Sequence, residues 1–236
     1  MDRAVRRDFI DIEKIENKEE RRRVIETMAV INERSKRTYW MVKRMMDFTL
    51  SLMALIVLAV PMLIIALVIW LDDKGQPIFT QTRVGRYGRE FQMHKFRTMV
   101  VNADKMKNDL MNQNEMDGPV FKIKKDPRIT RVGSFLRRTS LDELPQFYDV
   151  LIGNMCIIGP RPPLPEEVAQ YTEYQKIRLL CTPGITCLWQ ISPRRNEISF
   201  DKWVEMDVDY VINRNIFLDI QIMFKTAFVM LRGEGR

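Results

Sequence analysis

The feature that most constrains this sequence is an apolar stretch without any charged residue, which runs from Phe48 to Leu71. An uncharged stretch of this length predicts a helix that inserts into a lipid bilayer. It is not typical of a signal peptide, because it begins far from the N-terminus and is followed by Asp72, Asp73 and Lys74 instead of a cleavage site of small residues. The chain is therefore expected to be embedded in a membrane.

Pro61 lies near the middle of this stretch and leaves two membrane geometries open. The simpler one is a straight span, with Lys43 and Arg44 on the cytoplasmic side and all residues after Leu71 on the other side. A proline inside a helix removes one backbone donor and clashes with the preceding turn, so we expect a bend. Each arm would have about a dozen residues and measure roughly 18 Å, which enters one leaflet but does not cross a hydrocarbon core of about 30 Å. A bent helix can therefore enter and leave by the same face.

The composition indicates which kinds of partner the chain could bind and which metal ion it could hold. The 38 Lys and Arg residues against 31 Asp and Glu give a net charge of +7, which suits phosphate, nucleic acid or an anionic membrane face without choosing among them. His94 is the single histidine, so any divalent cation would need oxygen ligands, which favours magnesium over zinc. The three cysteines match neither a zinc pattern nor a disulfide scaffold, which indicates a reducing, cytosolic side. Because these cysteines follow the apolar stretch, they favour the re-entrant hairpin.

We expect three parts along the chain: a charged amphipathic extension over residues 1–40, a re-entrant membrane helix over 41–72, and a cytosolic catalytic domain over 73–236. In the extension, Val24, Met28 and Ile31 recur at helical spacing after an arginine cluster. This pattern predicts a helix that lies on the membrane or on a partner, and a solvated helix explains it equally well.

The part after the apolar stretch is expected to be α+β and dominated by helix. Two β-forming runs, 77–84 and 90–96, are separated by glycines and predict a small β-hairpin. Helical patterns cover 101–116, 141–151, 165–180 and 216–231. The last of these has one apolar face, which fits either an interfacial amphipathic helix or packing in the core.

The stretch most indicative of chemistry places Asp142 and Glu143 side by side at a helix start, directly after two arginines. A carboxylate can attack a phosphoryl group and form an acyl phosphate when cations offset the charge of the donor. A structural interpretation competes with this one. Ser140 and Glu143 have the spacing of a capping box, and acidic residues complement the first turn of any helix.

Several basic residues near this stretch are candidate phosphate ligands: Lys95, Arg97, Arg128, Arg137, Arg138 and Arg161. Arg161 lies between Pro160 and Pro162, whose fixed φ angles stiffen its backbone, so its guanidinium would need little ordering to bind phosphate. A surface turn with a solvated arginine explains the same residues. A tight turn expected at 183–184 leads to Trp189, which suits stacking on a nucleobase or packing in a core.

Short motifs follow one another along the chain: Lys43-Arg44 with Asp47 and Ser51, the proline-broken apolar stretch, Lys95-Phe96-Arg97-Thr98-Met99, Asp126-Pro127-Arg128-Ile129-Thr130, Arg137-Arg138-Thr139-Ser140-Leu141-Asp142-Glu143-Leu144-Pro145-Gln146, Gly159-Pro160-Arg161-Pro162 and Pro183-Gly184-Ile185-Thr186. As an ordered set, over about residues 40–236, they resemble the bacterial sugar transferase family. These are the monotopic polyprenyl-phosphate phosphoglycosyl transferases.

The resemblance implies transfer of a hexose 1-phosphate from a UDP-sugar to polyprenyl phosphate, with release of UMP and with Mg²⁺ as cofactor. Asp142 would be the covalent nucleophile and Glu143 its neighbour in metal or proton handling, so both would be metal ligands. The substrate-binding residues implied by the motifs are Lys95, Arg97, Arg128, Arg137, Arg138, Arg161 and Thr186. Those implied for the membrane hairpin are Arg44, Asp47, Ser51 and Pro61.

The resemblance also implies a location and a pathway. We expect the bacterial inner membrane, with catalysis on the cytosolic face, and the first step of exopolysaccharide, capsule or other glycoconjugate assembly. Glucose or galactose is the favoured sugar, because of the insert over 101–131. Partners would be the UDP-sugar, polyprenyl phosphate and membrane lipid but no nucleic acid, and a homodimer is left open.

Two residues depart from the family pattern. Val60 precedes Pro61 where many relatives have serine, and Cys187 stands where glycine is usual. Large members have extra membrane helices before this domain, so the chain is expected to be a short, catalytic-only form. The competing hypothesis is a non-enzymatic single-pass membrane protein with a basic binding domain, which explains the charge but not the Asp-Glu pair.

Overall fold

The structure is a computed structural model that describes residues 9–34, 37–103, 105–106, 108–115, 117–121, 123, 126–193 and 198–231. Residues 1–8, 35 and 36 of the predicted extension lie outside the described residues. The α-helices are α2 (Lys18–Arg34), α3 (Arg37–Asp73), α4 (Arg131–Thr139), α5 (Gln146–Ile152), α6 (Pro165–Val168), α7 (Glu173–Lys176), α8 (Phe200–Asn213) and α9 (Ile216–Leu231). The strands are β1 (Ile78–Val84), β2 (Glu90–Phe96), β3 (Cys156–Ile158) and β4 (Gly184–Thr186). The 3₁₀ helices are η1 (Ile12–Lys14), η2 (Arg86–Gly88), η3 (Asn108–Gln113), η4 (Leu141–Glu143), η5 (Ile177–Leu180) and η6 (Trp189–Ile191).

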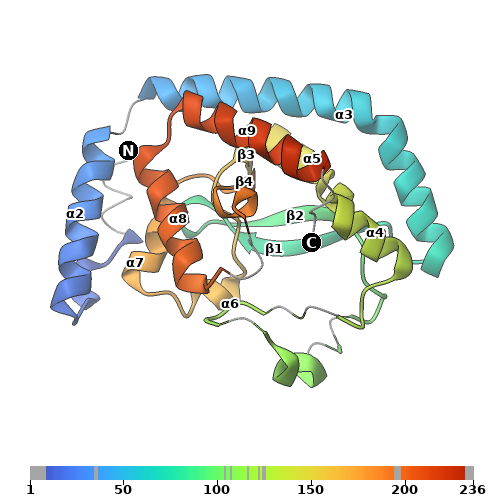
Figure 1. Cartoon of the computed structure of the whole chain (residues 1–236), viewed down its shortest axis with the longest axis horizontal. Helices are drawn as coiled ribbons and strands as arrows, with labels where there is room; N and C mark the ends of the chain where they lie inside the picture. The colour runs from blue at the N-terminus through green and yellow to red at the C-terminus, as the bar shows by residue number, and fades with distance from the viewer. Residues whose placement is uncertain are drawn as a thin grey trace.

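The whole apolar stretch lies in one helix, α3, with Pro61 inside it. Figure 1 shows that this helix is bent: its first arm runs along one side of the molecule and its second arm turns toward the β-hairpin. The backbone donor that proline removes from the helix accounts for the bend. The expected bend is therefore present, as one continuous helix and not as two helices joined by a turn. Entry and exit by the same membrane face stays a prediction.

α3 has polar residues on its inner side and apolar residues on its outer side. Lys43 and Asp47, one turn apart, are buried against the rest of the protein, whereas Val57 and Leu63 are 72% and 70% exposed. Among the described residues, one helix is long and apolar enough to cross a membrane, Thr38–Asp73. Only 6% of its most apolar window is buried, so it is not the core helix of a soluble domain. An apolar surface of this extent indicates a contact with lipid or another apolar partner.

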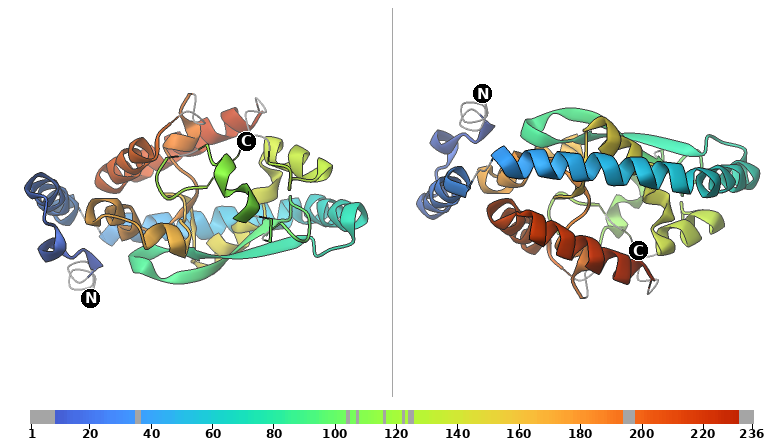
Figure 2. Two further views of the ribbon diagram at one scale, coloured as in Figure 1. Left: turned by 90° about the horizontal axis from the view of Figure 1, so that it is seen from below. Right: turned by 90° about the horizontal axis from the view of Figure 1, so that it is seen from above.

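α9 lies beside the first arm of α3, on the same side of the molecule (Figures 1 and 2). It has the predicted bounds, 216–231. Part of the helix packs in the core, and the expectation that it lies at a membrane interface stays a prediction. Asp219 and Ile222 are buried in the core, whereas Phe217 and Phe224 are 70% and 69% exposed. α9 therefore adds its outer side to the apolar surface of α3.

The predicted β-hairpin is confirmed. β1 and β2 pair antiparallel, with Ile78 opposite Phe96 and Val84 opposite Glu90. At the turn, Tyr87 and Gly88 both have left-handed φ angles, of 57° and 75°. The hairpin crosses the middle of the molecule and ends near the second arm of α3 (Figure 1).

A second sheet, β3 with β4, was not anticipated from the sequence. The two strands are parallel, with Cys156 opposite Gly184 and Ile158 opposite Thr186. The backbone at Gly184, the first residue of β4, lies in direct contact with the backbone at Gly159, just after β3. A Cβ added to Gly184 would lie 2.1 Å from the backbone nitrogen of Gly159. Glycine at 184 is thus required by this close approach.

The helix predicted in the extension forms, and its apolar face packs on the chain's own α7 and α8. Val24, Met28 and Ile31 are buried in the same core cluster as Trp203 of α8. The expected environments for this face were a membrane, a partner or solvent, and in the structure it packs instead on the chain's own core.

Three predicted helices are shorter than expected. Within 101–116 the described residues form only η3, where four asparagines lower the helix propensity. Pro145 separates η4 from α5 within 141–151, because it lacks the donor that would continue the turn. Within 165–180, Thr172 begins α7 with a capping box that separates it from α6. The helix α8 was not anticipated from the sequence.

Candidate active site

Asp142 and Glu143 lie in η4, the short turn between α4 and α5. Ser140 precedes the turn with a left-handed φ of 57°, and its side chain makes no capping hydrogen bond. The capping-box interpretation of Ser140 and Glu143 is therefore wrong. Instead, Oε1 of Glu143 lies 2.8 Å from Nζ of Lys95 on β2. This ion pair joins the carboxylate turn to the end of the hairpin.

Asp142 is a partly exposed carboxylate between charges of both signs. Burial raises the pKa of Asp142 to about 6; Lys95 and Arg137 oppose this rise, and Glu143 adds to it. The carboxylate is therefore mostly ionised at neutral pH although it is poorly solvated. Such a combination is typical of functional carboxylates.

Arg137 is positioned by a tight contact between α4 and the residues that follow β2. Its Nε donates to Oγ1 of Thr98 at 2.8 Å. A Cβ added to Gly133 would lie 2.0 Å from the carbonyl oxygen of Thr98, so only glycine permits α4 to come this close. Burial lowers the pKa of Arg137, and the charge of Asp142 opposes this. The guanidinium and the candidate nucleophile therefore influence each other directly.

Arg161 is half-buried at the corner over 159–163, and its charge reaches the same site. Burial is the main cause that lowers the pKa of both Lys95 and Arg137, and Arg161 adds to the lowering in each case. In the part of the chain that the structure describes, Arg137 and Arg161 form no ion pair with a carboxylate. Two arginines without counter-ions thus accompany the Lys95–Glu143 pair.

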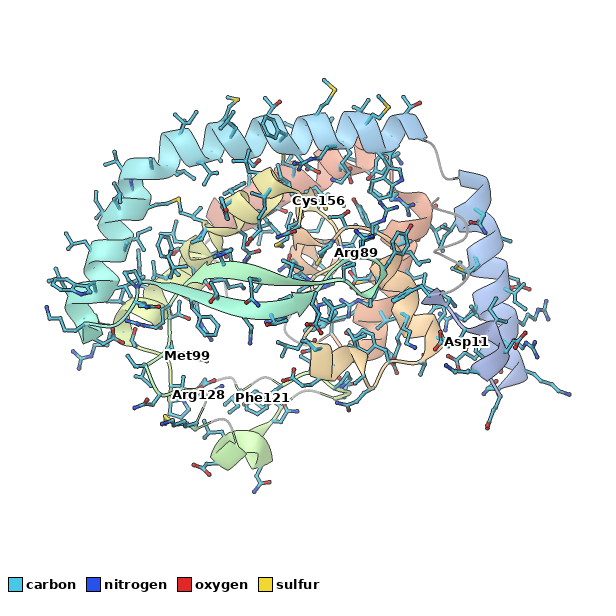
Figure 3. All side chains as sticks on the ribbon, turned by 180° about the vertical axis from the view of Figure 1, so that it is seen from behind. Asp11, Arg89, Met99, Phe121, Arg128 and Cys156 are labelled. Carbon is cyan, nitrogen blue, oxygen red and sulfur yellow. The ribbon has the colours of Figure 1, made fainter. Side chains whose placement is uncertain are left out.

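Two other predicted phosphate ligands are neutralised within the protein. Arg97 forms an ion pair with Asp73 at the end of α3. Arg128 is buried and pairs with Asp126 at 2.6 Å. Figure 3 shows Arg128 beside Phe121, in the loop on the far side of the hairpin from α3. The charge of Arg128 still acts on Arg137, whose pKa it helps to lower, and a role of Arg128 in substrate binding stays a prediction.

The remaining predicted contacts fall in different surroundings. Arg138 is exposed on α4. The hydroxyl oxygen of Thr186 lies 2.9 Å from that of Thr226 on α9. Trp189 is buried and stacks on Trp203 with 4.2 Å between ring centroids, so it is a core residue and the nucleobase-stacking interpretation is wrong.

The residues predicted for the membrane hairpin fasten α3 to the rest of the protein. Both Nη atoms of Arg44 donate at 2.7 Å to the carbonyls of 150–151, at the C-terminal end of α5, where a cation also suits the helix dipole. Asp47 accepts the backbone N–H of Ile157 at 3.2 Å. Ser51 is fully buried and its hydroxyl donates back to its own helix.

Sequence reasoning missed a buried polar network around Asp219 of α9. Its carboxylate accepts the hydroxyls of Tyr210 at 2.7 Å and Tyr39 at 3.0 Å, and lies 3.3 Å from Nζ of Lys43. A single acidic residue within the apolar helix over 216–231 was a usable signal, because a charge on such a helix needs a partner. Arg83 was also missed. It is buried near the end of β1, and nothing in a short β-forming run distinguishes it from a solvent-facing arginine.

A magnesium ion is compatible with the Asp142–Glu143 pair. Among the described residues no group of three or more His, Cys, Asp or Glu side chains could hold a metal. Mg²⁺ binds through one or two carboxylates together with substrate phosphate and water, so two adjacent carboxylates suffice.

These features describe a protein with one long, exposed apolar helix and with basic side chains gathered around a carboxylate pair. Residues 38–233 match the bacterial sugar transferase family. A galactosyl transferase, CpsE, of Streptococcus agalactiae is 45% identical over 85% of this chain and 44% of its own length. An undecaprenyl-phosphate galactose phosphotransferase of Salmonella typhimurium is 41% identical over 88% of this chain and 44% of its own length. The exopolysaccharide production protein ExoY of Sinorhizobium fredii is 38% identical over 82% of this chain and 87% of its own length.

The chain thus spans 44% of the length of the first two relatives. Its match covers most of its own residues, including every motif from Lys43 onward. The chain therefore belongs to the bacterial sugar transferase family.

Proposed function

We propose that this protein transfers a hexose 1-phosphate from a UDP-sugar to a polyprenyl phosphate such as undecaprenyl phosphate, through a covalent intermediate on Asp142. The observation that carries the proposal is a poorly solvated carboxylate beside Lys95 and within the field of Arg137. The relative from Salmonella typhimurium is named as an undecaprenyl-phosphate galactose phosphotransferase. Membership of a transferase family disfavours the non-enzymatic alternative.

In the first step, Asp142 attacks the phosphorus atom that carries the sugar. A bond forms between a carboxylate oxygen and this phosphorus, the bond to the bridging oxygen breaks, and UMP leaves with that oxygen. Arg137 and Arg161 bind the phosphate oxygens, which holds the donor in line and stabilises the charge on the leaving group. Lys95 keeps Asp142 ionised by opposing the rise of its pKa.

In the second step, an oxygen of the polyprenyl phosphate attacks the same phosphorus. The bond to Asp142 breaks, the free carboxylate returns, and the product is a polyprenyl diphosphosugar. The two steps use the same cations, because each passes through a similar charged phosphoryl group. Partial burial of Asp142 limits competing attack by water on the intermediate.

Asp142 and Glu143 would hold Mg²⁺. When bound, the ion supplies positive charge that offsets the donor diphosphate. Galactose or glucose is the sugar we favour, in agreement with the galactose in the name of the relative from Salmonella typhimurium. The reaction would begin the assembly of an exopolysaccharide, capsule or other glycoconjugate.

We further propose that the catalytic domain lies on the cytosolic face of the bacterial inner membrane, and that α3 is re-entrant. Both ends of α3 are bonded to the same domain: Arg44 to the end of α5, and Asp73 to Arg97 after β2. A straight span would separate these two ends by a membrane. The exposed apolar sides of α3 and α9 suit a lipid surface.

Intact-mass spectrometry after mixing with the UDP-sugar alone tests the mechanism. The wild type should gain the mass of one sugar phosphate and release UMP without polyprenyl phosphate. Asp142→Asn should remain folded, form no adduct and lose at least about a thousandfold in rate, which is about 4 kcal/mol of barrier. UMP release that strictly requires polyprenyl phosphate would argue for direct transfer, and a near-normal rate for Asp142→Asn would remove Asp142 from the mechanism.

A further inference from the structure

The corner that carries Arg161 is held by one hydrogen bond to each of four successive carbonyls. The donors are Gly184 N to Pro160 O at 3.0 Å, Arg178 Nη2 to Arg161 O at 3.4 Å, Arg83 Nη1 to Pro162 O at 3.0 Å, and Val84 N to Pro163 O at 2.9 Å. Three of these four residues are prolines and have no N–H, so the segment is held through its carbonyls. The backbone beneath Arg161 therefore has a fixed position before any ligand binds.

Arg83 is the side chain that connects this corner to the hairpin. It is 8% exposed, and its Nε and Nη2 donate to Oε1 of Gln81 at 3.2 and 2.7 Å. The third contact, to the Pro162 carbonyl, comes from the same planar guanidinium. Because the planar guanidinium is fixed on two sides, Arg83 links the position of β1 to that of Arg161.

The charge of Arg83 is unusual for a buried arginine of this protein. Two other buried arginines have carboxylates: Arg128 pairs with Asp126 at 2.6 Å, and Arg178 with Asp207 at 2.5 Å. Within the described ranges, Arg83 forms no such ion pair. Burial, and next the like charge of Arg161, lower the pKa of Arg83 to about 10, whereas the charges of Glu167, Glu143 and Glu166 oppose the lowering. Arg83 therefore stays protonated at neutral pH, with carboxylates in its surroundings but, in the described part of the chain, no direct ion pair.

A buried cation without a direct ion pair is unfavourable, and a second cation beside it adds repulsion. The more distant charges of Glu167, Glu143 and Glu166 offset part of this cost. An anion bound between Arg83 and Arg161 would offset more of it, because it would lie next to both guanidinium groups. A diphosphate suits this site, because it offers several oxygens to two guanidinium groups.

We propose that Arg83 and Arg161 form one binding pair for the diphosphate of the nucleotide donor, and that Arg83 in addition positions Arg161 through the Pro162 carbonyl. The identity of the donor rests on the proposed function, whereas the binding of a diphosphate by the pair does not. Arg83 is thus a further substrate-binding residue of this site.

Isothermal titration calorimetry of the full chain in lipid nanodiscs, with inorganic pyrophosphate and separately with UDP, tests the pair. Arg83→Gln and Arg161→Gln should each weaken pyrophosphate binding at least tenfold. The double variant should lose less than the product of the two effects, because both arginines hold the same anion. The matched control is Arg89→Gln, which removes the same charge from an exposed residue at the hairpin turn (Figure 3) and should bind as the wild type does.

Wild-type affinity of a folded Arg83→Gln for pyrophosphate would overturn the proposal, as would fully multiplicative losses in the double variant. If Arg83→Gln does not fold, Arg83→Lys replaces it. Lysine keeps the charge but cannot bond Gln81 and the Pro162 carbonyl together, so at least a threefold loss is expected, and unchanged affinity would refute the proposal. A wild type that binds pyrophosphate but releases UMP from no UDP-sugar would refute the proposed function and leave the pair in place.

Discussion

Asp142 has to be ionised to act as a nucleophile, and its pKa of about 6 lies within the range of ordinary enzyme assays. Burial disfavours the charged carboxylate, whereas Lys95 and Arg137 favour it. These opposing influences keep a partly buried acid mostly ionised at neutral pH. The proposed reaction would therefore depend on each of the two cations.

The first prediction concerns pH. Without a bound cation, the carboxylate gains a proton as the pH falls through about 6. At Mg²⁺ concentrations well below saturation, the rate of adduct formation should therefore fall about tenfold per pH unit below that value and be level above pH 7. Lys95→Met removes a cation that lowers this pKa, so the midpoint should move upward. Quenched single-turnover reactions analysed by mass spectrometry measure both profiles. An unchanged midpoint in Lys95→Met would show that Lys95 does not act on Asp142.

At the residue scale, short motifs of distinctive composition made Asp142, Glu143, Arg137 and Arg161 candidates, and the structure places their charges near one another. Their roles stay predictions. The sequence could not show which arginines pair with a carboxylate of the protein and which do not, because such pairing depends on contacts that only the fold creates. Arg97 meets Asp73 across the end of α3, and this contact joins residues of different elements. A missing counter-ion is likewise invisible in a sequence.

At the scale of elements, the two apolar helices α3 and α9 follow closely from the sequence, and α9 has the predicted bounds. Length, absence of charge and Pro61 were sufficient for the apolar helix and its bend. The short helices were mistaken for longer ones, because capping at Thr172 and the break at Pro145 outweigh helical periodicity. The pairing of β3 with β4 joins residues far apart in the chain and has no local signal.

The second prediction concerns the topology of α3. Single cysteines at Thr38, in the first turn of α3, and at Gln76, just after its last turn, are both exposed and should react with an impermeant maleimide from the cytosolic side. The three native cysteines are buried, so background labelling should be low. Pro61→Leu restores the missing donor and should shift molecules toward a full span, with Gln76→Cys reacting from the opposite face. Labelling of the wild-type pair from opposite faces would contradict a re-entrant helix.

The third prediction concerns the network that joins α3 to α9. Asp219→Ala removes one partner of buried Lys43 and should lower the free energy of unfolding by about 3 kcal/mol. Urea unfolding in detergent measures the change. Asp209→Ala, which removes a carboxylate from the exposed side of neighbouring α8, is the control and should change stability by less than about 0.5 kcal/mol. Equal stability of both variants would show that the ion pair does not hold the two helices together.

At the scale of the whole molecule, polar groups and apolar surface are divided between two sides. α3 and α9 lie together and expose apolar residues, whereas the carboxylate turn and its cations lie where the hairpin, α4 and α5 meet (Figures 1 and 2). A chain with net charge +7 and such a surface suits an anionic membrane. In the proposed function, this division would bring a lipid-borne acceptor and a water-soluble donor to one turn of the chain.

The described part of the N-terminal extension packs into the main core, although it lies before the residues that match the family. The match begins at residue 38, yet Ile10, Ile15 and the inner face of α2 belong to the main core cluster. Arg23 of α2 also lies 3.9 Å from the ring centroid of Tyr174. α2 therefore covers α7 and α8 as part of the catalytic fold.

The last prediction follows from this arrangement. Ile31 is 1% exposed, so Ile31→Ala leaves a cavity against α8 and should lower the free energy of unfolding by about 2–4 kcal/mol. Arg22→Ala, on the exposed face of the same helix, loses only a surface pair with Glu26 and should cost less than about 0.5 kcal/mol. Urea unfolding compares the two variants. Because α2 and α4, the helix directly before η4, lie at opposite ends of the molecule (Figure 1), the rate of adduct formation per folded molecule should be unchanged in both. Equal stability of Ile31→Ala and the wild type would show instead that α2 is an appendage whose removal the catalytic domain tolerates.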